Sequence, residues 1–229
     1  IAYVGTSYSG WQIQEKPNPP PTIQGEMEKA LRTITGQHIR AYGSGRTDSG
    51  VHAHGQVVHC DVPDARPSMD WRRRLTAVLP RDIRVLEAMQ AAPDFHARKD
   101  ALRNTYAYQF RLEQPFMPPQ LTPFVCTCGP LHVEALRAAL PPLTGLHDFA
   151  ALRNVGTDVE STERTVLQAE LHAMPPYEFY PPHAPMLRFI VTADGFLKQM
   201  VRNLAGLPAA RGPGKVLPKH IPAPPAPPD

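Results

Sequence analysis

Three features are scarce in this sequence, and each scarcity argues against a class of protein. The chain has 3 cysteines, Cys60, Cys126 and Cys128, too few for a disulfide framework, so we expect reduced thiols in a cytoplasm. It has no run of about 18 consecutive apolar residues, so we expect no transmembrane helix. Its first residues lack the basic and apolar regions of a secretory signal, so we expect no signal peptide.

Neither sign of charge dominates, and the apolar content is that of a folded protein. The 24 basic and 21 acidic residues leave a net charge of +3, which permits a polyanionic partner without requiring one. Hydrophobic residues make up 42% of the chain, enough for a packed core. Of the 28 prolines, 8 lie in the last 22 positions, so we expect residues 208–229 to form a Pro-rich tail that is extended or disordered.

The spacing of apolar residues predicts helices and strands in two groups. Thr22 and Ser68 are typical helix N-caps, and Gly36 is a typical helix end. Pro80 should stop the second helix, and Pro208 should end the last one early. The predicted helices cover 23–34, 71–79, 133–140 and 196–206, and the predicted strands lie within 1–14, 56–62, 105–112, 165–171 and 187–192.

This order favours an α+β protein with two similar lobes over a single doubly wound sheet. We expect an N-terminal lobe over residues 1–100 and a C-terminal lobe over residues 101–207, followed by the tail.

The segment from Gly43 to His52 is dense in small and polar residues. Glycines let a backbone approach a ligand closely. Asp48, near Arg46, is a carboxylate that can act as a nucleophile or a base when ionised. The alternative is an ordinary Asx-turn, in which Asp48 only bonds the backbone of Gly50.

A histidine-rich stretch follows this loop, with His52, His54, His59 and Cys60. Such a spacing can bind zinc if His52 and His54 share one face of a strand. No second pair at a recognised spacing completes the site, and Cys126-x-Cys128 lies far away in the sequence. We therefore favour histidines at the surface or facing RNA over a metal site.

Basic residues precede an aromatic strand in the middle of the chain. They are His96, Arg98, Lys99 and Arg103, and the strand carries Tyr106 and Tyr108. Cations beside aromatic rings are what single-stranded RNA recognition uses. The alternative is a solvated charged loop leading into a strand with buried tyrosines.

The predicted helix over 196–206 has one apolar face. Arg202 projects roughly opposite the middle of that face and Lys198 lies near it, so both should point to solvent or into a cleft. The alternative is an ordinary amphipathic helix with a polar outer face.

Taken in order, these pieces resemble the tRNA pseudouridine synthase A family. The matching motifs lie between residue 1 and about residue 206, and the Gly-Arg-Thr-Asp-x-Gly-Val-His string is the most specific. They are Ala2–Gln12, Thr22–Gln24, Gly45–Ala53, Gly55–Val57, Leu79-Pro80-x-Asp82-Ile83, Asp94–Arg98, Tyr106-x-Tyr108, His147–Phe149 and Met200–Asn203.

The resemblance implies an isomerase that converts uridine to pseudouridine in the tRNA anticodon arm, typically at tRNA positions 38, 39 and 40. Asp48 matches the essential aspartate, Tyr106 the tyrosine that stacks on the target base, and Arg202 the arginine that pairs with the catalytic carboxylate. The basic motif residues Arg46, His96 and Arg98 are expected along the RNA path, and His52 is expected to contact the substrate as well.

The family fold implies two α+β lobes around a continuous antiparallel sheet with a central RNA-binding cleft. It also implies a cytoplasmic homodimer whose cleft uses both subunits. No metal or organic cofactor is implied.

The chain departs from the family pattern in places. Position 76 is Thr where the family usually has Asn, and after Asn203 the usual sequence is replaced by one that contains Pro208. The family's closing strand is not recognisable, and the Pro-rich tail stands in its place. The alternative to an active enzyme is therefore a catalytically impaired RNA-binding remnant of the same family.

Overall fold

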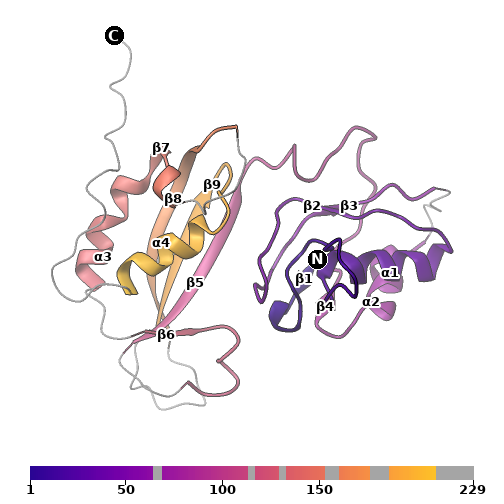
Figure 1. Cartoon of the computed structure of the whole chain (residues 1–229), viewed down its shortest axis with the longest axis horizontal. Coiled ribbons are helices and arrows are strands. Elements are labelled where there is room, and N and C mark those ends of the chain that lie inside the picture. The colour runs from indigo at the N-terminus through magenta and orange to yellow at the C-terminus, as the bar shows by residue number, and fades with distance from the viewer. Residues whose placement is uncertain (64–68, 113–116, 129–132, 153–159, 176–185, 210–229) are drawn as a thin grey trace, which may run out of the picture. The chain divides into compact units, whose positions relative to one another are not determined.

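The computed structural model describes residues 1–63, 69–112, 117–128, 133–152, 160–175 and 186–209. The chain forms two compact units, Ile1–Ala101 (unit 1) and Leu102–Asp229 (unit 2), each described by itself (Figure 1). The expected tail over residues 208–229 lies outside the described residues, apart from the end of the last helix.

Unit 1 combines two helices with two small antiparallel strand pairs. Strand β1 pairs with β4 and strand β2 pairs with β3, while an isolated bridge joins Tyr3 to Ala53. Its helices are α1 (Ile23–Thr35) and α2 (Trp71–Val78), and its strands are β1 (Ala2–Tyr3), β2 (Tyr42–Gly43), β3 (Val58–His59) and β4 (Ile83–Arg84).

Helix α1 confirms the prediction from its capping residues. The Thr22 side chain accepts a hydrogen bond from the Gly25 amide at 3.2 Å, and Gly36 ends the helix in the left-handed conformation at φ 76°. One face buries Ile23 and Leu31 completely in the core of unit 1. Burying each such side chain stabilises the fold by roughly 1.5–3 kcal/mol.

Helix α2 shows one wrong and one confirmed prediction. Asp70 caps the helix, because its carboxylate accepts a hydrogen bond from the Arg73 amide at 2.9 Å; the expected cap, Ser68, lies outside the described residues. The helix ends at Val78, two residues before Pro80, as expected. The predicted strand over 56–62 is reduced to β3, which pairs with β2.

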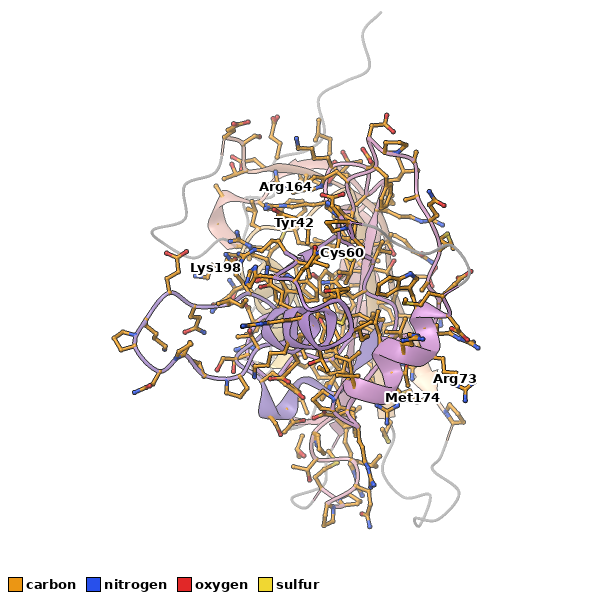
Figure 2. The ribbon with its side chains drawn as sticks, turned by 90° about the vertical axis from the view of Figure 1, so that its right-hand side faces the viewer. Tyr42, Cys60, Arg73, Arg164, Met174 and Lys198 are labelled. Carbon is orange, nitrogen blue, oxygen red and sulfur yellow. The ribbon has the colours of Figure 1, made fainter. Side chains whose placement is uncertain are left out.

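Unit 2 is built on a five-stranded sheet with the order β6-β5-β9-β8-β7. The pairs β5–β9, β9–β8 and β8–β7 are antiparallel, but β5 and β6 are parallel, so the sheet is mixed. Its strands are β5 (Asn104–Leu112), β6 (Cys126–Cys128), β7 (Gly145–Asp148), β8 (Glu163–Met174) and β9 (Met186–Ala193), and its helices are α3 (Val133–Ala139) and α4 (Met200–Ala209). In Figure 2, the labels Arg164 and Met174 mark the two ends of β8.

One face of this sheet forms the core of unit 2. Phe110 on β5, Val166 on β8 and Val191 on β9 are buried there, and α3 and α4 pack against the same cluster (Figure 1). The predicted strand over 105–112 is therefore confirmed, with its even-numbered residues toward the helices.

Helix α4 differs from its prediction at both ends. It begins at Met200 rather than Phe196, because Gln199 before it adopts a left-handed backbone with φ 62°. It runs one residue past Pro208, which did not end it early: a proline in the last turn removes only one helical N–H. Within the described ranges, no helix combines the length and apolarity needed to cross a membrane.

Candidate active site

The loop that carries Asp48 is held by the N-terminal segment of unit 1. The Trp11 amide donates to the Thr47 carbonyl at 3.0 Å, and the Gly50 amide donates to the Tyr8 carbonyl at 3.2 Å. The hydroxyls of Tyr3 and Thr47 also share a hydrogen bond at 2.9 Å. Residues far apart in the sequence therefore fix the backbone on both sides of Asp48.

Two glycines make this close packing possible. A Cβ on Gly10 would lie 2.3 Å from the Thr47 carbonyl oxygen, and the residue has φ +86°, which other residues rarely adopt. A Cβ on Gly5 would lie 2.0 Å from the Val51 carbonyl oxygen. Any side chain at either position would push the loop away.

Asp82 holds the N-terminal segment through two hydrogen bonds. The Tyr8 hydroxyl donates to the Asp82 carboxylate at 2.7 Å, and the Val4 amide donates to the Asp82 carbonyl at 2.9 Å. Burial, followed by the neighbouring Asp82 carboxylate, raises the pKa of Tyr8 well above its usual value. The phenol therefore stays protonated and keeps donating to Asp82.

Asp48 is half-buried, and its carboxylate takes no part in the hydrogen bonds that hold the loop. The turn is closed by backbone groups, the Val51 amide donating to the Asp48 carbonyl at 3.2 Å. Within the described residues of unit 1, the Asp48 carboxylate makes no hydrogen bond or ion pair, with Gly50 or with the exposed Arg46. The Gly50 amide donates to the Tyr8 carbonyl instead, so the Asx-turn interpretation is wrong.

The histidines after the loop lie beside a single β-bridge. His52 and His54 flank the bridge of Ala53 to Tyr3, and His54 is exposed. The Gly5 amide donates to Nδ1 of His52 at 3.1 Å, which fixes the ring against the N-terminal segment. Among the described residues, no three His, Cys, Asp or Glu side chains gather into a group that would hold a metal ion.

His96 organises the basic loop that follows β4. Its Nδ1 accepts hydrogen bonds from the Arg98 and Lys99 amides, at 3.2 and 3.3 Å, while its own amide donates to the Asp100 carboxylate at 2.7 Å. These hydrogen bonds hold the His96 ring in one orientation. Arg98 and Lys99 carry positive charge on this loop, and both side chains are exposed.

Tyr106 lies on β5, on the face of the sheet that carries the helices. Its ring is half-buried and meets Phe196 edge to face, with the ring centroids 5.0 Å apart. Tyr108, two residues further, packs on the same core cluster. Both tyrosines are partly buried, so they match neither fully exposed rings that face RNA nor fully buried core tyrosines.

Arg202 lies on α4, exposed as predicted, while the opposite helix face buries Met200 and Leu204. Burial and a hydrogen bond with Cys126 raise the pKa of Tyr108, and the charge of Arg202 acts in the opposite direction. Lys198 is exposed in the turn before α4 rather than on it.

The structure thus gathers the predicted site residues into two groups. Asp48, Arg46, His52, His96 and Arg98 belong to unit 1; Tyr106 and Arg202 belong to unit 2. The predicted ion pair between Asp48 and Arg202 stays a prediction, because each unit is described by itself.

Three supporting residues were not predicted from the sequence. Tyr8 and Asp82 hold the segment behind the Asp48 loop, and Asn203 donates to the Leu152 carbonyl at 2.8 Å, which ties α4 to the chain after β7. All three lie in motifs on which the resemblance rests, but the sequence pattern does not predict their contacts.

The comparisons with known proteins agree with this site. A family model described as tRNA pseudouridine synthase matches residues 1–99 and 139–223, which extends beyond residue 206, where the recognised motifs end. A tRNA pseudouridine synthase A from Oleidesulfovibrio alaskensis is 46% identical, over 97% of this chain and 85% of its own length. Proteins with the same name from Lawsonia intracellularis and Geobacillus kaustophilus are 44% and 39% identical, over 97% and 96% of this chain and 86% and 81% of their own lengths.

The family model covers more than half of the chain, and the relatives align along nearly all of it. Both matches include the Asp48 loop and the segment that holds it. The chain therefore belongs to the tRNA pseudouridine synthase family.

Proposed function

We propose that this protein is a tRNA pseudouridine synthase that isomerises uridine to pseudouridine in the anticodon stem-loop, at tRNA positions 38, 39 and 40. The observation that carries the proposal is the Asp48 carboxylate, which has no partner among the described residues of unit 1, on a loop fixed from both sides, in a chain of this family. An ionisable group in a rigid, partly buried setting is what a nucleophile or base requires.

The reaction breaks the C1′–N1 glycosidic bond, turns the uracil, and joins C5 to C1′, after which the proton on C5 is lost and N1 gains one. Asp48 serves this sequence by attacking C1′ or C6, or by removing a sugar proton; all three roles need its ionised form. Arg202 would keep the carboxylate ionised and oriented, because a planar guanidinium favours the charged form of an acid beside it.

The target base must leave its stack before it reaches Asp48. Tyr106 would receive it, and the edge-to-face contact with Phe196 supports this role by holding the ring in one orientation. Arg46, His52, His96 and Arg98 would line the RNA path, where Arg46 and Arg98 supply positive charge and the two histidine rings supply hydrogen-bonding nitrogens.

The wider assembly follows the family pattern. We propose that the two units form the lobes of one continuous sheet around a central cleft, and that a homodimer in the cytoplasm shapes the RNA site with both subunits. The proposed reaction calls for no metal or organic cofactor.

The test is pseudouridine mapping by mass spectrometry on unmodified tRNA incubated with the protein. Formation of pseudouridine at positions 38, 39 or 40 is expected. Binding of the tRNA with no pseudouridine at any position would contradict the enzymatic function and favour an RNA-binding remnant.

A further inference from the structure

Unit 1 carries a cluster of aromatic rings outside the Asp48 loop. Tyr42 on β2 lies directly opposite His59 on β3, and their rings stack with centroids 5.0 Å apart and planes at 16°. The His96 ring lies 4.5 Å from that of His59, and the Phe95 ring lies 6.2 Å from it. We call Tyr42, His59 and His96 the ring cluster.

The ring cluster is not part of the hydrophobic core. On the β3 segment, Val58, Cys60 and Val62 pack against the core of unit 1, whereas His59 points to the other side with Tyr42. Tyr42, labelled in Figure 2, keeps 43% of its surface exposed. A stacked pair of rings that leaves so much tyrosine surface in water contributes little to stability for its size.

The histidines of the ring cluster are fixed in orientation. Nδ1 of His59 accepts a hydrogen bond from the Ala97 amide at 3.1 Å, and Nδ1 of His96 accepts those of Arg98 and Lys99. The same bonds position the exposed Arg98 and Lys99 next to the cluster.

We propose that the ring cluster binds an unpaired nucleotide of the tRNA, with the base stacked on the open face of Tyr42 and the adjacent phosphate bound by Arg98 and Lys99. Base stacking on an aromatic ring beside cations is the common mode of single-stranded RNA recognition. Tyr42 lies six residues before Asp48, on the strand that enters the Asp48 loop. The inference rests on the proposed function, and it adds Tyr42 and His59 to the RNA-binding surface.

The test compares variants of the full chain for binding to unmodified tRNA by fluorescence anisotropy, over a range of salt concentrations. Tyr42→Leu should weaken binding by about 5- to 150-fold, the loss of one stacked base, and should leave the salt dependence unchanged. Tyr42→Phe keeps the ring and should bind within about twofold of wild type. Melting temperatures of both variants identify any loss that comes from unfolding.

The phosphate contacts have a matched control. Lys99→Gln should reduce the slope of log affinity against log salt by about 0.7, whereas Arg73→Gln, an exposed arginine on α2, should not change it. Folded Tyr42→Leu protein that binds tRNA as tightly as wild type would overturn the inference, even if pseudouridine still forms. If wild type neither binds nor modifies tRNA, the proposed function fails first and this inference fails with it.

Discussion

At the scale of single residues, Gly10 determines whether the Asp48 loop is held. Gly10→Ala places a Cβ 2.3 Å from the Thr47 carbonyl oxygen, at a residue with positive φ. We therefore expect the free energy of unfolding to fall by about 1–3 kcal/mol. Gly55→Ala is the matched control, because a Cβ there has no neighbour within 4 Å. Urea denaturation measures both; equal stability of the two variants would contradict the tight packing.

His59 makes a prediction about pH. Burial, followed by the charge of His96, lowers the pKa of His59 below 6.5, whereas Asp61 and Asp100 act weakly in the opposite direction. Between that lowered pKa and 6.5 the unfolded chain binds more protons, so stability is complete above pH 6.5 and falls as the pH falls through this window. Titration of the His59 ring by NMR should give a midpoint below 6.5; a midpoint above 6.5 would show that protonation stabilises the fold.

At the scale of elements, α4 is positioned by one side chain that the sequence pattern did not single out. Asn203→Ala removes the hydrogen bond to the Leu152 carbonyl, and we expect a loss of about 0.5–1.5 kcal/mol. Glu134→Ala, at an exposed position on α3, should change stability by less than about 0.5 kcal/mol. Equal unfolding free energies for the two variants would show that Asn203 does not anchor the helix.

The helices and loops also show which features of the fold the sequence predicts and which it does not. Both ends of α1 were predictable, because Thr22 and Gly36 act through bonds within one helical turn. The start of α4 was not, because Gln199 leaves the helical conformation although the apolar spacing continues through it. The loop of Asp48 was identifiable from its composition, but its hydrogen bonds to Tyr8 and Trp11 join distant segments and leave no periodic pattern.

At the scale of the whole molecule, affinity for tRNA should depend strongly on salt. Arg46, Arg98, Lys99 and Lys198 are exposed cations. If these four contact single-stranded phosphates, the slope of log affinity against log salt is about −3. Anisotropy titrations between low and moderate salt measure it; a flat dependence would contradict binding along the phosphate backbone.

The proposed pairing of Asp48 with Arg202 also belongs to this scale, because the two residues come from different units. Arg202→Lys keeps the charge but loses the planar fork, so we expect the rate of pseudouridine formation to fall far more than tRNA affinity. Single-turnover rates and binding constants for this variant and wild type separate the two effects. An equal loss of rate and affinity would assign Arg202 to RNA binding alone.

The most direct test of the account is pseudouridine formation by Asp48→Asn. The amide keeps the size of the carboxylate but acts neither as a nucleophile nor as a base, so the account predicts tRNA binding close to wild type with no pseudouridine formed. Asp61→Asn, an exposed aspartate of the same unit, is the control and should retain activity. Pseudouridine formed by Asp48→Asn at a rate near that of wild type would contradict the central claim.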